Sequence, residues 1–210
     1  MFDLDGLLLE SEQIWNASKE ELVRTRGGRW TTEAEHAMLG MSSPEWSRWM
    51  RDELGVPLDP DEISAEVVRL LAASYEERLP LLPGSDGAVR RLAARWPLGL
   101  ASSSNREIID LALGLAGWTG VFDTTVSSEE VARGKPAPDV YLEAMRRLEV
   151  APASCAAVED SGAGIRSAAA AGLRVIAIPN PDYPPDDEAL ALAAVVLESV
   201  HELDPAKLDE

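Results

Sequence analysis

The chain has 210 residues, of which 46% are hydrophobic and 27% are charged, and its formal net charge is −18. This composition is that of a folded globular protein, with one large domain or one domain carrying a smaller insertion. The acidic excess repels phosphate backbones and anionic lipids, so we expect no nucleic-acid or membrane partner. An anionic substrate would need a local positive centre, such as a metal ion with a lysine.

The cysteine content and hydropathy indicate a cytoplasmic protein. Cys155 is the single cysteine and has no internal disulfide partner, which is typical of a reducing compartment. We find no signal-peptide pattern and no apolar run of about 18 residues. We therefore expect a cytoplasmic protein that neither spans nor crosses a membrane. We separately expect a monomer.

The start of the chain is short for a strand. Only Met1 and Phe2 precede Asp3, whereas a buried strand normally has about five residues. We expect either a short first strand or a chain that begins later than the natural protein.

Residues 11–79 show only helical patterns, with apolar residues three and four positions apart, polar caps at the starts and glycines at two of the ends. The expected helices are 11–26, 32–39, 43–54 and 60–79.

After Gly84, helical segments alternate with short apolar runs. The expected strands are 98–101, 122–126, 155–158, 175–178 and 194–197, and the expected helices are 85–96, 106–116, 138–148 and 162–171. This alternation predicts an α/β fold with a parallel sheet covered on both faces. We place the core at 1–9 and 82–210 and the helical insertion at 10–81.

Polar residues gather at the carboxyl ends of the expected strands, which is where ligands bind in such sheets. They are Asp3, Asp5, Ser102, Lys135, Glu159 and Asp160. Each alone is more often a turn residue, a surface charge or a helix cap. Their joint placement at one edge favours a common site.

The residue types at this edge suit phosphoryl transfer. Asp3, Glu159 and Asp160 offer the carboxylate oxygens that Mg²⁺ prefers. Ser102 and Lys135 can bind phosphate oxygens, the first by a hydrogen bond and the second by charge. Asp5 is then left to transfer a proton to a leaving oxygen.

Four segments resemble the motifs of the haloacid dehalogenase (HAD) superfamily, and most closely its sugar-phosphatase and β-phosphoglucomutase-like branch. They are FDLDG at 2–6, LASSS at 100–104, GKPAPD at 134–139 and VEDSGAGI at 158–165. The resemblance covers essentially the whole chain in order and spacing. It implies a Rossmann-like core with a helical cap domain inserted after the first strand.

The resemblance also implies roles for these residues. Asp3 would be the nucleophile that forms an aspartyl-phosphate, and Asp5 would be the general acid and then the general base. Ser102 and Lys135 would hold the phosphoryl group of a small phosphomonoester.

A magnesium site follows from the same motifs. Mg²⁺ would be bound by Asp3, the backbone carbonyl of Asp5, and Asp160, with Glu159 either binding the ion or supporting its ligands. True dehalogenases, as a class, lack the second aspartate of the first motif, so the presence of Asp5 indicates phosphate chemistry.

Two positions bear on the reaction type. Glu10 stands where relatives often have an aspartate, at the cap hinge. Mutases of this branch tend to carry a histidine at the position of Trp15, and neither His36 nor His201 falls there. We therefore expect a sugar- or polyol-phosphate hydrolase. The alternatives are a β-phosphoglucomutase-type mutase and a non-catalytic protein that binds a metabolite or a partner.

Substrate contacts are expected from the hinge, the cap and the residues after the second motif. The candidates are Glu10, Trp15, Gly40, Ser42, Ser103 and Asn105. Trp15 either lines a sugar pocket or belongs to the cap core. Trp46 and Trp49, three residues apart, are predicted to be cap core.

Overall fold

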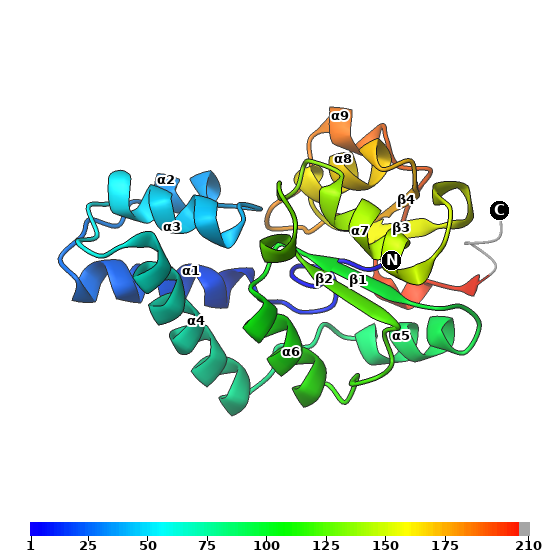
Figure 1. Cartoon of the computed structure of the whole chain (residues 1–210), viewed down its shortest axis with the longest axis horizontal. Helices are drawn as coiled ribbons and strands as arrows, with labels where there is room; N and C mark the ends of the chain where they lie inside the picture. The colour runs from blue at the N-terminus through cyan, green and yellow to red at the C-terminus, as the bar shows by residue number, and fades with distance from the viewer. Residues whose placement is uncertain (206–210) are drawn as a thin grey trace.

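The computed structural model describes residues 1–205, which form a helical cap and an α/β core (Figure 1). The cap helices are α1 (Glu12–Thr25), α2 (Thr32–Ala37), α3 (Ser43–Asp52) and α4 (Pro60–Glu77). Helices α1 and α3 pack on α4, and α4 also packs on α6 (Arg106–Leu115) of the core. All four cap helices fall within the predicted insertion, whose boundaries at 10 and 81 remain a prediction.

Local sequence sets where two of the cap helices, α3 and α4, begin. The backbone N–H of Ser42 donates to Glu45 at 2.8 Å, and that of Asp59 donates to Glu62 at 3.1 Å. Both pairs are capping boxes, which satisfy N–H groups that a helix leaves unpaired at its start. A proline follows each cap within the first turn, where its missing N–H costs nothing.

The core alternates strands and helices in the predicted order. Its strands are β1 (Gly99–Ser102), β2 (Thr124–Ser127), β3 (Ala156–Glu159), β4 (Arg174–Ala177) and β5 (Val195–Val196). Its helices, besides α6, are α5 (Ser85–Ala93), α7 (Asp139–Leu148), α8 (Gly162–Ala170) and the short α9 (Asp187–Leu190). Its described part also contains the 3₁₀ turns η1 (Ser128–Glu130), η2 (Pro152–Ser154) and η3 (Val200–Glu202). Each pair of these strands within residues 1–205 is parallel: β1 with β2, β3 with β4, and β4 with β5.

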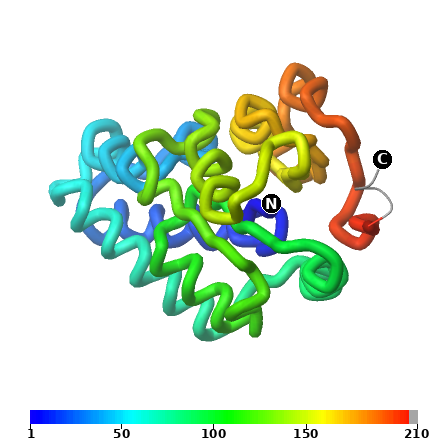
Figure 2. The backbone as a smooth tube through the Cα atoms, turned by 45° about the vertical axis from the view of Figure 1, so that its right-hand side comes forward, coloured from blue at the N-terminus to red at the C-terminus, as the bar shows by residue number. Residues whose placement is uncertain are grey.

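A very short segment at the start of the chain joins the two halves of the sheet. The N–H of Phe2 donates to Gly99 at 2.8 Å, and its carbonyl accepts from Ala101 at 2.8 Å. On the other side, the N–H of Asp3 donates to Val158 at 3.1 Å. This segment therefore lies between β1 and β3, and Figure 2 shows it in the interior of the core.

Both faces of the sheet are buried, as the sequence predicts. Leu100 and Ile176 belong to the hydrophobic cluster on one face, whereas Ala101 and Val175 belong to the cluster on the other. This alternation follows from the two-residue period of a strand. The α/β fold class with a parallel sheet is confirmed. Within residues 1–205, no helix is both long and apolar enough to cross a membrane.

The packing of Phe2 gives a first prediction. Its side chain is 1% exposed, and its ring meets Phe122 edge to face with centroids 6.1 Å apart. We expect Phe2→Ala to lower the free energy of unfolding by about 3–5 kcal/mol, because the substitution leaves a cavity at the centre of the sheet. Urea denaturation measures this change. The control Leu192→Ala, at a side chain 48% exposed, should shift the value by no more than about 0.5 kcal/mol. Equal effects of the two substitutions would contradict the central place of Phe2.

Candidate active site

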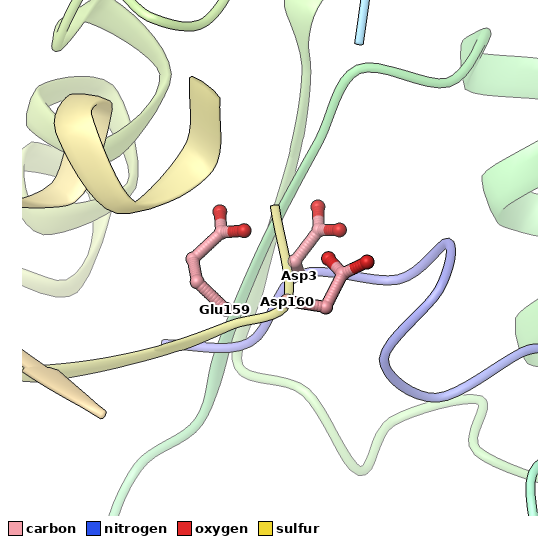
Figure 3. A group of neighbouring side chains, drawn as sticks. All are labelled: Asp3, Glu159 and Asp160. Atoms are coloured by element: carbon pink, nitrogen blue, oxygen red, sulfur yellow. The ribbon is translucent and has the colours of Figure 1, made fainter. Parts of the chain in front are cut away.

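Three carboxylates converge at the carboxyl end of the sheet (Figure 3). Asp3 follows the joining segment, Glu159 ends β3, and Asp160 is the next residue. One carboxylate oxygen from each lies within 4.8 Å of the others, and all three residues are buried. Parallel strands bring these residues together because their carboxyl ends meet at one edge.

Lys135 holds two of these carboxylates. Its Nζ donates to Oδ1 of Asp3 and to Oε1 of Glu159, both at 2.6 Å. The hydroxyl of Tyr141 also donates to Oε1 of Glu159, and its ring lies 5.3 Å from the lysine Nζ. Lys135 is itself buried, so water screens these charges little.

Burial shifts the pKa values of Asp3, Asp160 and Lys135. It raises the pKa of Asp3 to about 8, although the Lys135 ammonium opposes this shift. Burial also raises the pKa of Asp160 well above its usual value, and the Asp3 and Glu159 carboxylates add to that rise. Burial lowers the pKa of Lys135, but the two carboxylates bound to it raise the pKa by more, so the ammonium stays protonated. Three acidic groups thus face one positive charge.

The residues present fit a divalent cation. Oε2 of Glu159 and Oδ1 of Asp160 are buried and find no hydrogen-bond donor among residues 1–205. A buried acceptor without a partner is costly, and a bound cation would supply that partner. Oxygen-only ligands of this kind suit Mg²⁺.

Two glycines make room for these carboxylates. A Cβ at Gly164 would lie 1.9 Å from Oε2 of Glu159, and one at Gly6 would lie 2.1 Å from Oδ2 of Asp160. Gly6 also has φ +77, in the left-handed region that favours glycine. Each motif therefore needs its glycine so that a carboxylate can occupy the space.

Asp5 is held by donors from both cap and core. Its Oδ1 accepts from Ser11 Oγ at 2.6 Å and from Trp15 Nε1 at 3.0 Å, both in the cap segment. Its Oδ2 accepts from Ser104 Oγ at 2.6 Å and from Ser102 Oγ at 3.4 Å, both in the core. The Asp5 carboxylate is therefore a direct link between the two parts of the molecule.

Asp5 also lies between two small cavities. The first, of about 50 Å³, is lined by Asp3, Lys135 and Asp160. The second, of about 60 Å³, lies under the cap. Its cap lining includes Trp15, Lys19, Met38, Met41 and Trp46. Four residues line both cavities: Asp5, Glu12, Gly40 and Ser103.

Two serines of the second motif, Ser102 and Ser103, have different surroundings. Ser102 is fully buried and its hydroxyl faces Asp5 and the N–H of Ser104. Ser103, not Ser102, lines the cavity beside Asp3 and Lys135. The expected phosphate contact of Ser102 therefore remains a prediction.

Of the substrate-binding candidates in the hinge and the cap, some line the two cavities and others do not. Gly40 lines both cavities and Trp15 lines the second. Glu10 is exposed and lines neither of them, while its N–H donates to Pro80. Ser42 is occupied with Glu45 as the cap of α3. The structure therefore does not bring Glu10 or Ser42 to the carboxylate site.

Asn105 joins cap and core. Its Oδ1 accepts from Ser43 Oγ at 2.7 Å, and its Nδ2 donates to Ser64 at 3.1 Å and to Glu129 at 2.8 Å. Ser43 and Ser64 lie on α3 and α4 of the cap, so these bonds fix the cap against the core. Asn105 lines neither cavity.

Sequence reasoning missed several residues at the site. Glu12 and Lys19 line the cavities from α1. Tyr183 lines the first cavity, and its hydroxyl accepts from Asn16 of the cap at 3.2 Å. Its ring also packs against His36, with centroids 5.9 Å apart. An aromatic residue within a proline-rich acidic loop is the signal that would have indicated this contact.

Comparison with known proteins agrees with this geometry. The family model "haloacid dehalogenase-like hydrolase" matches residues 1–172. The chain belongs to the haloacid dehalogenase-like hydrolases. This confirms the resemblance that the four motifs carry.

Relatives of this hydrolase include phosphatases. It is 31% identical to hexitol phosphatase B of Escherichia coli K12, over 97% of this chain and 92% of that protein. It is 32% identical to the bifunctional riboflavin kinase/FMN phosphatase of Arabidopsis thaliana, where the match covers 86% of this chain but only 48% of the relative. The crystal structure of CbbY from Rhodobacter sphaeroides in complex with phosphate superposes with a TM-score of 0.90. That match is 28% identical in sequence and covers 100% of this chain and 97% of CbbY.

The buried carboxylates predict a pH-dependent response to Mg²⁺. The pKa of Asp3 in the folded protein, about 8, lies above the usual value of an aspartate. The free energy of unfolding of the metal-free protein should therefore fall as the pH rises from 3.8, the usual pKa of an aspartate, to about 8, its pKa in the folded protein. Mg²⁺ competes with the proton, so it binds more tightly at high pH. We expect the rise in Tm caused by Mg²⁺ to be larger at about pH 8.5 than at about pH 6, by roughly 2–4 °C or more.

Thermal melts of two variants check this assignment. Asp160→Asn should remove most of the Mg²⁺-dependent rise in Tm. Asp110→Asn alters a carboxylate that is 61% exposed on α6, and should keep that rise. A rise in Tm that is independent of pH, or retained in Asp160→Asn, would contradict the site.

Proposed function

We propose that this protein hydrolyses phosphomonoesters of small sugars or polyols, with Mg²⁺, through an aspartyl-phosphate on Asp3. The position of Asp5 between the two cavities carries this proposal. A phosphoryl group beside Asp3 and Lys135 would place its leaving alcohol in the cavity under the cap. Asp5 would then lie beside the ester oxygen that joins the phosphoryl group to the leaving alcohol.

The relatives support the substrate class. One is named a hexitol phosphatase, and another, 29% identical over 98% of this chain, a probable pseudouridine-5′-phosphatase from Drosophila melanogaster. Both names describe a phosphate carried on a hydroxyl-rich carbon skeleton. The aromatic and polar lining of the second cavity is compatible with such a leaving group.

The first half-reaction transfers the phosphoryl group to Asp3. A carboxylate oxygen of Asp3 attacks phosphorus, and the bond from phosphorus to the leaving oxygen breaks. Asp5, entering as the neutral acid, gives its proton to that oxygen, so the alcohol leaves uncharged. The Lys135 ammonium lies 2.6 Å from Asp3 and offsets negative charge on the phosphoryl oxygens.

The second half-reaction restores the enzyme. Asp5, now a carboxylate, takes a proton from a water molecule that attacks phosphorus. The bond between phosphorus and the Asp3 oxygen breaks, which releases inorganic phosphate and leaves Asp5 protonated again. Asp3, Asp160 and the Asp5 backbone carbonyl would hold Mg²⁺, with Glu159 binding or supporting it, and the ion would neutralise charge on the phosphoryl oxygens.

Phosphate release from a panel of sugar, polyol and nucleotide monophosphates tests this function. We expect release from hexose or polyol phosphates with Mg²⁺, and a loss of at least about 1,000-fold in Asp3→Asn, because that variant has no nucleophile. Asp110→Asn is the control and should keep the parent rate, and both variants should keep the parent far-UV circular dichroism.

Other outcomes of the panel would replace the proposal. Isomerisation of β-glucose 1-phosphate to glucose 6-phosphate without phosphate release would indicate a mutase. Binding of phosphates without any turnover would indicate a metabolite-binding protein. Full activity in Asp3→Asn would show that the nucleophile lies elsewhere.

The two roles of Asp5 can be separated with p-nitrophenyl phosphate. Nitrophenolate leaves without a proton, so Asp5→Asn should still phosphorylate Asp3. Hydrolysis of the aspartyl-phosphate still needs a base, so it should be slow. We expect a burst of about one equivalent of nitrophenolate, followed by slow turnover. Stopped-flow absorbance measures the burst, and linear kinetics at the parent rate would exclude both roles.

A further inference from the structure

Lys19 is a buried lysine in the cap that the reaction proposed above does not use. It lies on α1, is 6% exposed and lines the second cavity. Its Nζ lies 5.4 Å from the ring centroid of Trp15 and 5.3 Å from that of Trp46. The ammonium is therefore close to both indole rings at the cavity wall.

The hydrogen-bonding capacity of this ammonium is not used. Lys19 forms no hydrogen bond or ion pair with any residue in the described range 1–205. The indole rings attract the charge, but they provide no oxygen acceptor for its three N–H groups. Burial lowers the pKa of Lys19 to about 8, although the carboxylates of Glu12 and Asp5 oppose this shift, so the amine remains mainly charged at neutral pH. A buried charge with free donors favours a ligand that brings an acceptor.

The charges of the residues that line the cavity favour one kind of hydrogen-bond acceptor for Lys19. Among the described residues that line the cavity, Lys19 has the only cationic side chain, whereas Asp5 and Glu12 bring two carboxyl groups. A second phosphate or a carboxylate on the substrate would place its negative charge beside these two carboxyl groups, with one ammonium to offset it. A hydroxyl fits, because its oxygen accepts from the ammonium and its proton can be donated to a carboxylate.

We propose that Lys19 is a specificity residue that donates a hydrogen bond to a hydroxyl oxygen of the leaving sugar or polyol. The inference rests on the proposed function, because it takes the second cavity to hold the leaving group. The Trp15 and Trp46 rings lie beside Lys19 and would contact the carbon chain of that group. Lys19 would thus favour phosphates of hydroxyl-rich alcohols over esters that lack hydroxyls.

A substitution that keeps the shape of the side chain tests this role. Lys19→Met removes the ammonium and keeps an unbranched apolar chain beside the rings. We expect the ratio of kcat/KM for sorbitol 6-phosphate to kcat/KM for p-nitrophenyl phosphate to fall by about 10- to 100-fold, the range for one hydrogen bond to a charged group. Lys19→Gln, which keeps an N–H donor without charge, should recover part of that ratio.

A matched control lies on the same helix. Arg24→Met also removes one positive charge from α1, but this side chain is 74% exposed. It should leave the ratio at its parent value. An equal fall for both substrates in Lys19→Met would show a structural role only, and an unchanged ratio would overturn the proposal.

Binding without turnover separates this inference from the proposed function. In an Asp3→Asn background, tryptophan fluorescence reports binding through Trp15 and Trp46. We expect Lys19→Met to weaken binding of sorbitol 6-phosphate by about 10-fold or more, while inorganic phosphate binds as in the parent. If Lys19→Met weakens sorbitol 6-phosphate binding although the parent shows no phosphatase activity, the inference on Lys19 holds and the proposed reaction fails.

Two further results would overturn the role of Lys19. One is unchanged binding of sorbitol 6-phosphate in Lys19→Met, or no binding of this ligand in the Asp3→Asn background. The other is a preference of the parent for fructose 1,6-bisphosphate over fructose 6-phosphate of about 10-fold or more that disappears in Lys19→Met. The second result would assign Lys19 to a distal phosphate instead of a hydroxyl.

Discussion

The contact of the Lys135 ammonium with Asp3 and Glu159 is the interaction on which the site depends. Three buried carboxyl groups within 4.8 Å of one another repel strongly if they are ionised, and burial strengthens the repulsion. Lys135 reaches two of them at 2.6 Å, and Tyr141 donates to the same Glu159 oxygen. Oε2 of Glu159 and Oδ1 of Asp160 are buried and have no donor among the described residues, which is the arrangement that a divalent cation completes.

The second organising feature is the attachment of the cap to Asp5. Ser11 and Trp15 bind one oxygen of this carboxylate, and Ser104 of the core binds the other. The residue proposed as the proton donor is thus oriented partly by the cap that covers the leaving group. A movement of the cap would change the hydrogen bonds of Asp5, which links substrate enclosure to proton transfer. Asn105 and Tyr183 add further contacts between cap and core.

The order of helices and strands was predictable because each rests on local chemistry. Apolar residues with helical spacing predict the four cap helices, and apolar runs before polar turns predict the core strands. The ends of some strands differ from those expected, because pairing with a neighbouring strand decides them. The strand expected at 122–126 is Thr124–Ser127 in the structure. The short helix Asp187–Leu190 was missed, because a single turn has too few residues to show a period.

The sequence by itself indicated the carboxylates and Lys135 of the site, because these residues follow strands, directly or after a loop, whose carboxyl ends must share one edge. Tertiary structure alone decided which cap residues reach that edge. Glu10 and Ser42 lie outside the cavities, whereas Lys19 lines the second cavity and Tyr183 the first. These positions depend on how α1 and the loop after β4 pack across the core, and side chains far apart in sequence acquire such contacts only through packing. A buried lysine without an acceptor is therefore recognised only in the folded protein.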